Sequence, residues 1–280
     1  MGFVDTSPSR LQRACRTWGG TAYKSLSIAF REPKPDVVVV ATPDNTHYPV
    51  LNQITGHQFK LVIMEKPLSV DLKQARAIRR WAKRRCIPLL VNYNRRFVPE
   101  FRRLAEIIHQ EEYGRFLTGT THYGKGLLHN GSHFIDLLIW FFGRIKPHRK
   151  FFLFKDYSPN DPSIAGELLV KNRPLFFLPV HSRLATIFEI DLFFSRGRIS
   201  ILNSGETVRE YRVLPHRIFR TIHTFQTSRS YKTSLFQSQY HMADTAYKYL
   251  LGKAELPINI DEAVENIGIC EKITHMDFYK

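Results

Sequence analysis

The chain has 280 residues, 43% of them hydrophobic and 13% aromatic, so it can bury a substantial core and is not a disordered protein. Its three cysteines form no CxxC pair, which excludes a disulfide framework and a zinc ligand set. We therefore expect no metal site and a reducing, cytoplasmic setting. We also expect neither a signal peptide nor a membrane helix, because the apolar runs are much shorter than the roughly 20 residues that span a bilayer.

The charge is the unusual feature of the composition. There are 41 Lys and Arg against 25 Asp and Glu, which gives a net charge of +16. Such a surplus attracts polyanions, including nucleic acids, acidic membrane surfaces and phosphorylated substrates. No zinc-finger, helix-turn-helix or aromatic RNA-binding signature accompanies it, so we do not expect nucleic acid as a partner. The densest basic run, 79–85, lies in a helical pattern and is interpreted as a solvated helix face.

The first part of the chain alternates strand and helix patterns, as βαβ units do. In chain order we predict a strand at 2–4, a helix at 10–18, strands at 37–41 and 61–65 separated by a helix at 48–55, and a strand at 88–93 after a helix at 71–85. The β-branched run at 37–41 is typical of a strand buried on both faces. The sequence therefore predicts a doubly wound parallel sheet of Rossmann type, in a domain of residues 1–97.

The pattern changes after this domain, and residues 98–280 become rich in strands separated by Pro, Gly and Asn turns. We predict helices at 99–110, 132–142, 237–251 and 261–274, and strands at 116–123, 151–156, 166–172, 174–182, 185–195, 197–203 and 209–214. Strands joined by such turns form hairpins. We therefore expect a second, α+β domain with a large, mostly antiparallel sheet, and the last helices should pack back on the molecule.

Polar residues follow two neighbouring strands of the predicted parallel sheet. Asn45 and His47 come directly after the run that ends in Ala-Thr-Pro, and Lys66 ends the next strand in Glu65-Lys66-Pro67. The carboxyl ends of parallel strands meet at one edge, where open α/β folds bind ligands. A cis bond to Pro67 would fix the direction of the lysine side chain. The alternative is a surface lysine that merely ends a strand.

Three segments, ATPDNTH (41–47), EKP (65–67) and NYNRRF (92–97), resemble in order and spacing the family of NAD(P)-dependent oxidoreductases that includes glucose-fructose oxidoreductase, inositol dehydrogenase and MocA. The resemblance spans nearly the whole chain. It implies that the first segment lines the nicotinamide and ribose of NAD or NADP, and that Lys66 contacts both cofactor and substrate. The cofactor-binding residues that it implies are Asp5, Ala41, Thr42, Pro43, Asn45, His47, Glu65, Lys66 and Asn94.

Asp5 follows the first predicted strand. It resembles the acid that accepts a hydrogen bond from the adenosine ribose 2′-hydroxyl, which favours NAD over NADP. An aspartate before Ser-Pro also forms an ordinary turn, and this alternative stays open.

A further motif opens the predicted helix at 132–142. His133 and Asp136 are three residues apart and share a face of this helix. A histidine on a half-buried helix is more often structural than catalytic, but the DxGxHxxD signature of the family implies that His133 is the catalytic histidine. The chain departs from this signature at its first acid, where it has His129. The expected Asp-Lys-His relay is then replaced by His129, Lys66 and His133, or the site is non-catalytic.

Several residues are predicted to bind the substrate. The segment Gly124-Lys125-Gly126 lacks the spacing of a phosphate-binding loop, so we interpret it as a loop near the substrate pocket. Its lysine and two arginines are predicted to contact an anionic group, such as the pyrophosphate of a sugar nucleotide; the alternative is that they are simply solvated. The predicted substrate-binding residues are Arg95, Arg96, Lys125, Asn130 and Asp136.

The start of the chain departs from the family pattern. The family begins with a strand and a GxGxxG turn whose amides hold the cofactor pyrophosphate, whereas residues 2–4 already match its second strand. We therefore expect the first strand and the glycine loop to be missing. A start codon placed too late, a truncated gene and the loss of cofactor binding would each explain this.

Taken together, the sequence predicts an NAD(P)-dependent oxidoreductase that transfers hydride at a carbinol carbon of a sugar, sugar nucleotide or related polyol. The resemblance also implies a homo-oligomer that associates through the C-terminal sheet. One alternative is a non-catalytic relative that acts as a binding or scaffold protein, supported by His129 and the missing glycine loop. A second alternative, a basic nucleic-acid-binding protein, is supported by the net charge alone.

Overall fold

A computed structural model describes residues 1–31 and 35–279 of the chain. Its N-terminal part contains two small parallel sheets. One joins β1 (Gly2–Val4) and β2 (Thr21–Tyr23), and the other has the order β3 (Val37–Val40), β4 (Leu61–Met64), β5 (Leu89–Val91). The connecting helices are α1 (Pro8–Trp18), α2 (Leu26–Ala29), α3 (His47–Ile54) and α4 (Leu72–Arg85). The predicted α/β organisation is confirmed.

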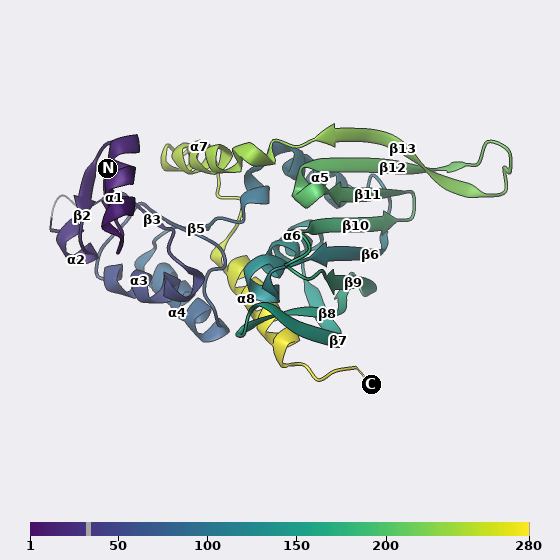
Figure 1. Cartoon of the computed structure of the whole chain (residues 1–280). Helices are drawn as coiled ribbons and strands as arrows, with labels where there is room; N and C mark the ends of the chain where they lie inside the picture. The colour runs from purple at the N-terminus through teal and green to yellow at the C-terminus, as the bar shows by residue number, and fades with distance from the viewer. Residues whose placement is uncertain (32–34, 280) are drawn as a thin grey trace.

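The strand β3 differs from the prediction. Val40 is 2% exposed, but Val39, on the opposite face of the strand, is 58% exposed. Helices α3 and α4 cover only the face that carries Val40 (Figure 1). The prediction that this strand is buried on both faces was therefore wrong. Among the described residues, no ladder of hydrogen bonds joins β3 to β1, so each of these strands is paired on one side only.

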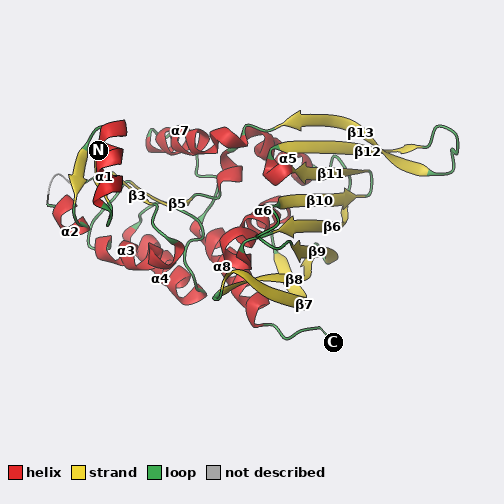
Figure 2. Ribbon diagram, viewed as in Figure 1, coloured by secondary structure: helices red, strands yellow, loops and turns green. Residues whose placement is uncertain are grey.

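The C-terminal part is built on one sheet of eight strands, in the order β13-β12-β11-β10-β6-β9-β8-β7. All neighbouring strands are antiparallel except β6 and β9, which confirms the predicted mostly antiparallel sheet. The strands are β6 (Phe116–Tyr123), β7 (Ile145–Ser158), β8 (Asp161–Val170), β9 (Arg173–Pro179), β10 (Phe188–Phe194), β11 (Gly197–Leu202), β12 (Thr207–Pro215) and β13 (His223–Lys232). Helices α5 (Pro99–His109) and α6 (Ser132–Phe142) lie beside this sheet (Figure 2).

The last two helices, α7 (Ser238–Leu250) and α8 (Ile260–His275), return to the N-terminal part, as expected from the sequence. Helix α8 packs on both halves: Val264 and Ile267 belong to the N-terminal core, while Ile269 and Ile273 belong to the C-terminal core. It lies between the two sheets in Figure 1. The packing of α8 therefore joins the two halves on which the site is built.

The structure also contains elements that the sequence did not predict, namely β2, α2 and β13. The first two are short, and β13 carries the polar sequence HTFQTSRSYK at the edge of the large sheet, so it lacks the apolar alternation of a half-buried strand. With β12 it forms a hairpin that projects from the body of the molecule (Figure 1). None of the helices in the described ranges has both the length and the apolar character that crossing a bilayer requires.

Candidate active site

Lys66 lies where the parallel sheet meets the C-terminal part. It follows β4, and its peptide bond to Pro67 is cis, as the sequence analysis considered. The ammonium Nζ donates a hydrogen bond to the backbone carbonyl of His129 at 2.7 Å. Burial lowers the pKa of Lys66, although the nearby carboxylates of Asp44 and Glu65 partly oppose this. A lysine with a lowered pKa can exchange a proton closer to neutral pH than an exposed one.

His129 is held by a short π-helical turn, Gly126–Gly131, which precedes α6. The carboxylate of Asp161, at the start of β8, accepts hydrogen bonds from the backbone N–H groups of Leu128 and His129, both at 2.8 Å. Gly126 has a φ of +78°, and a side chain at this position would collide with that carboxylate. The turn is therefore built around Asp161, and it fixes where the ring of His129 lies.

The imidazole of His129 has two further contacts. Its Nδ1 atom lies 2.7 Å from Oδ2 of Asp44, a residue of the loop after β3. Its ring stacks on Tyr157 with 4.8 Å between the ring centroids. Burial raises the pKa of Asp44, but the hydrogen bond and charge of His129 outweigh this effect, so the pKa is lowered overall and the carboxylate stays ionised. His129 is thus paired with an acid from the other half of the molecule.

His133 lies near these groups, on the first turn of α6. Its ring packs edge-to-face with Tyr93 at 6.0 Å and with Phe188 at 6.2 Å. Burial lowers its pKa well below the ordinary value of 6.5, and the charges of Arg95 and Lys66 act in the same direction. Part of the side chain nevertheless remains exposed to solvent. The histidine is therefore a neutral imidazole near pH 7, which can accept or donate a proton.

The loop after β3 is tied to the loop that carries Lys66. His47 is completely buried, with Nε2 at 2.8 Å from the carbonyl of Thr42 and Nδ1 at 2.7 Å from the carbonyl of Pro67. Its predicted direct contact with a cofactor needs correction, because no part of the ring is accessible and both nitrogens face the protein. Ala41, Pro43 and Asn45, by contrast, are exposed at the carboxyl edge of the sheet.

Three buried polar atoms at this edge test whether the site fits a cofactor. Among the described residues, Oγ1 of Thr42, Oδ1 of Asn92 and Oδ1 of Asn94 have no hydrogen-bond partner. Such atoms are rare in folded proteins and cost free energy unless something satisfies them. Thr42 follows β3 and Asn94 follows β5, so both lie where open α/β sheets bind ligands. These residues fit the ribose hydroxyls and the carboxamide of a nicotinamide ribose.

The other predicted cofactor residues are placed as follows. Oε1 of Glu65 accepts a hydrogen bond from Asn92 at 2.7 Å, so this acid orients the strand ends of β4 and β5. Oδ1 of Asp5 accepts from the N–H of Ser7 at 2.7 Å, which is the ordinary turn that the sequence analysis left open. Its other carboxylate oxygen lies 3.8 Å from Arg10.

The predicted substrate contacts of Arg96 and Asp136 are contradicted by their burial. Their side chains are 1% and 3% exposed and form an ion pair at 3.0 Å. Arg96 also donates to Glu262 at 2.9 Å and to the carbonyl of Pro257 at 3.1 Å. The donors of Arg96 are thus used inside the protein. The pair joins α6 to the N-terminus of α8, and neither side chain can reach a substrate directly.

The remaining predicted substrate residues are Arg95, Asn130 and Lys125. Arg95 is 7% exposed, stacks on Phe188 at 3.7 Å and donates to the carbonyl of Ser204 at 2.7 Å. Burial lowers its pKa to about 9. Asn130 donates to the carbonyl of Gly124 at 2.8 Å, and Lys125 is partly exposed. No comparison tests their binding roles, which stay predictions.

The sequence analysis missed the two acids and the aromatic ring that hold His129. Asp44 was visible within ATPDNTH, but its neighbours Asn45 and His47 were singled out instead. Tyr157 and Asp161 lie between the strands predicted at 151–156 and 166–172. No spacing signal links these residues to His129.

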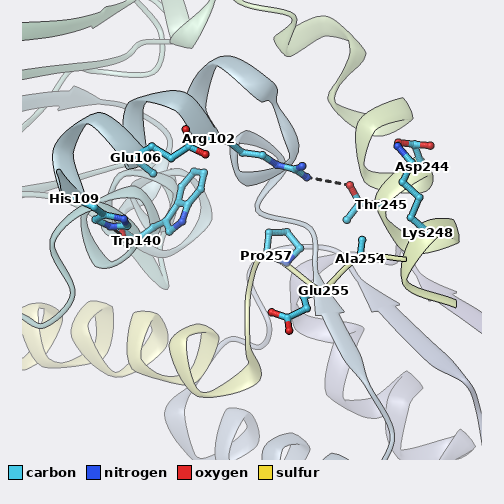
Figure 3. A pocket seen from close by; sticks show the side chains of 11 residues that line it. Arg102, Glu106, His109, Trp140, Asp244, Thr245, Lys248, Ala254, Glu255 and Pro257 are labelled. Atoms are coloured by element: carbon cyan, nitrogen blue, oxygen red, sulfur yellow. Dashed lines mark hydrogen bonds and ion pairs between the residues drawn. The ribbon is translucent and has the colours of Figure 1, made fainter. Parts of the chain in front are cut away.

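A separate cavity of about 360 Å³ lies between α5, α6 and α7 (Figure 3). It is lined by Arg102, Ala105, Glu106, His109, Trp140, Asp244, Thr245, Lys248, Ala254, Glu255 and Pro257. The side chain of Arg102 crosses the cavity and donates a hydrogen bond to Thr245 at 3.1 Å. The lining of the cavity carries both positive and negative side chains. None of the groups around Lys66 contributes to this cavity, so it is not part of the candidate active site.

Part of the chain is similar in sequence to known oxidoreductases. The family profile described as "Oxidoreductase family, NAD-binding Rossmann fold" matches residues 1–93. An inositol 2-dehydrogenase of Mycolicibacterium vanbaalenii is 38% identical over 88 residues, which cover 31% of this chain and 25% of that protein. An uncharacterized oxidoreductase of Escherichia coli, YdgJ, is 31% identical over 96 residues, covering 34% of this chain and 28% of that protein. The chain thus spans about a quarter of the length of these relatives.

Solved structures match over almost the whole chain. A levoglucosan dehydrogenase, solved with NADH and levoglucosan, has a TM-score of 0.78 at 15% identity and covers 98% of this chain and 86% of its own. The WlbA dehydrogenase of Bordetella pertussis, solved with NADH and UDP-GlcNAcA, has a TM-score of 0.76 at 14% identity with the same coverage. At these identities the likeness establishes the fold. The first third of the chain is thus similar in sequence to the NAD-binding part of an oxidoreductase family, and almost the whole chain shares the fold of these solved dehydrogenases.

Proposed function

We propose that this protein is an NAD(P)-dependent oxidoreductase that acts on a carbinol carbon of a sugar, sugar nucleotide or related polyol. The observation that carries the proposal is the position of Lys66, at the carboxyl edge of the parallel sheet and in contact with the turn that precedes His133. The unsatisfied atoms of Thr42 and Asn94 lie at the same edge. A basic group, a neutral histidine and a place for a nicotinamide ribose are thus combined in one region.

The residues of the site have distinct roles in this proposal. Thr42 and Asn94 would hold the nicotinamide ribose, and NAD(P) bound there would supply the hydride acceptor or donor. Lys66, whose pKa is lowered, takes the hydroxyl proton of the substrate during oxidation and returns it during reduction. His133 can accept or donate a hydrogen bond to the same hydroxyl, since it stays neutral. The ring of Phe188 limits the space beside His133.

The test compares two lysines on the same strand region. Lys66→Ala should abolish most turnover of a sugar or polyol panel with NAD⁺ and NADP⁺, and Lys66→Arg should not restore it, because arginine stays protonated. Lys60→Ala is the matched control, since Lys60 precedes β4, is 70% exposed and pairs with Asp36 at 3.1 Å. Turnover by the Lys66→Ala variant at the level of the control would refute the assignment.

The finer assignments are also proposals. We propose that Asp5 favours NAD through its Oδ2 atom, which pairs with Arg10 at 3.8 Å and would meet the ribose 2′-hydroxyl. The ratio of kcat/KM for NAD⁺ and NADP⁺ in Asp5→Ala tests this. We also propose that an anionic sugar group binds Arg95, whose charge acts on His133, and Lys125, which is partly exposed. We further propose that the protein is cytoplasmic and forms a homo-oligomer through the C-terminal sheet. Size-exclusion chromatography with light scattering would detect the oligomer.

A non-catalytic relative that binds a sugar or scaffolds other proteins is the second candidate. It is favoured by one observation, the histidine at position 129 where the family signature has an acid. Isothermal titration with sugars separates the two candidates. Sugar binding without any oxidation of NADH or reduction of NAD⁺ would favour the second candidate.

A further inference from the structure

The family signature has an acid where this chain has His129, so the site must handle protons in another way if the proposed function is right. In the structure this histidine is not an isolated substitution. Its Nδ1 atom is 2.7 Å from the carboxylate of Asp44, which comes from the loop after β3 in the other half of the molecule. The two side chains are 28% and 32% exposed. Their pairing therefore takes place at the rim of the site, partly shielded from solvent.

The ring of His129 is also restrained on its other sides. Asp161 holds the backbone of the turn through two hydrogen bonds, and Tyr157 stacks on the imidazole. Lys66 donates to the carbonyl of the same residue. With that of Asp44, these contacts come from three separate segments of the chain, since Tyr157 and Asp161 lie at the ends of one hairpin. The histidine is accordingly fixed in position, and only its Nε2 atom is left without a hydrogen-bond partner among the described residues.

An ionised carboxylate accepts a hydrogen bond but cannot donate one. Neutral His129 must therefore carry its proton on Nδ1, and its lone pair is then on Nε2. A carboxylate that fixes the tautomer of a histidine in this way is a known device for making the distal nitrogen a proton acceptor. Burial raises the pKa of Asp44, but the hydrogen bond from His129 and the charge of Lys66 act in the opposite direction, and the pKa is lowered overall, so Asp44 remains ionised in this setting.

We propose that Asp44 and His129 form a dyad in which Asp44 is a positioning residue that fixes the proton on Nδ1, so that Nε2 of His129 carries the reaction proton between Lys66 and solvent. The proposal rests on the proposed function. During oxidation, the O–H bond of the substrate breaks and its proton passes to Lys66, then to Nε2 of His129 and finally to water. NAD(P)⁺ held by Thr42 and Asn94 would take up the hydride from the carbinol carbon, so electrons and protons balance. The dyad takes the place of the single acid of the family signature.

The first experiment does not depend on turnover. In ¹⁵N-labelled protein, long-range ¹H–¹⁵N spectra distinguish the two neutral tautomers of histidine, and His129→Gln assigns the signals. We expect His129 to be the Nδ1–H tautomer at neutral pH, and Asp44→Asn to shift it toward the Nε2–H form. Asp36→Asn is the matched control, because Asp36 precedes β3 and is exposed. A tautomer that is the same in the wild type and in Asp44→Asn overturns the proposal, whether or not a substrate has been found.

The second experiment measures kinetics. Asp44→Asn should lower kcat about 100-fold, near the lower end of what proton transfer by a side chain contributes, with a smaller change in the KM for cofactor. Asp44→Glu should restore part of the rate. His129→Asp places two carboxylates side by side and should be less active than the double variant His129→Asp, Asp44→Asn. If Asp44→Asn keeps its kcat within twofold while Lys66→Ala is inactive, the dyad is wrong and the proposed function stands. If no variant nor the wild type turns over any substrate, the proposed function fails and the tautomer spectra alone decide on the dyad.

Discussion

Replacing Asp136 by alanine tests whether the pair with Arg96 holds the fold or binds substrate. The variant leaves the Arg96 guanidinium, 1% exposed, with Glu262 and the backbone carbonyls of Pro257 and of residue 136 as its remaining partners. Removing one partner of a buried ion pair costs about 3 to 5 kcal/mol, because the other charge stays buried without compensation. Against a typical stability of about 5 to 15 kcal/mol, this loss is large.

The matched control is Asp261→Ala. Asp261 also pairs with two basic residues, Arg79 at 2.9 Å and Lys83 at 2.6 Å, but its side chain is 50% exposed. Solvent screens such pairs, so we expect a loss of at most about 1 kcal/mol. Urea denaturation followed by tryptophan fluorescence measures both variants, since Trp140 lies 5.4 Å from the guanidinium of Arg96. If Asp136→Ala is destabilised no more than Asp261→Ala, the structural role of the pair is refuted; a raised KM at unchanged stability would restore its predicted role in substrate binding.

The same pair has a pH dependence with a definite sign. Burial raises the pKa of Asp136 to about 6, and Arg96 opposes this increase only in part. Because the folded pKa lies above the unfolded value of 3.8, the folded protein binds this proton more tightly. The contribution of Asp136 to the free energy of unfolding is fully present below about pH 4 and is lost as the pH rises through about 6. The difference in stability between the wild type and Asp136→Ala should therefore be larger at about pH 4.5 than at about pH 7.5.

Three further predictions concern the site. Because the pKa of Lys66 is lowered from the ordinary value of 10.5, kcat/KM for oxidation should reach its plateau below pH 10.5. A kcat/KM that still increases at pH 10.5 would contradict this assignment. His133 should give NMR signals that do not titrate between about pH 6 and 8, and a midpoint in that range would show that it is not buried as the structure has it. NADH should bind weakly in a fluorescence titration, because the printed sequence contains no GxGxxG turn for the pyrophosphate; a micromolar Kd would show that other residues hold it.

Much of the fold follows from local patterns. The β-branched run at 37–41, the apolar run at 61–65 and the basic amphipathic helix between 71 and 85 repeat with the periods of strands and helices, so their type is determined by nearby residues alone. The position of Lys66 followed as well, because the carboxyl ends of parallel strands share an edge. Polar edge strands such as β13 could not be predicted in this way, since their stability comes from pairing with a neighbour.

The burial of Arg96 and Asp136 could not be predicted from the pattern of nearby residues. Helical spacing placed Asp136 on the face of His133, but only the packing of α8 against α6 decided that the acid would be buried and that Glu262 would reach the same arginine. The depth of a residue depends on what covers it, and the covering helix lies more than a hundred residues further along the chain.

The pairing of Asp44 with His129 has the same origin. The two residues are 85 positions apart, and the acid that holds the turn lies 32 positions beyond His129. By itself the sequence predicted the resemblance to the family, the type of each main element and the edge of the sheet on which Lys66 lies. The tertiary structure alone decided which acid faces which base, because such contacts depend on how the two halves pack together, and no periodicity of the backbone encodes that packing.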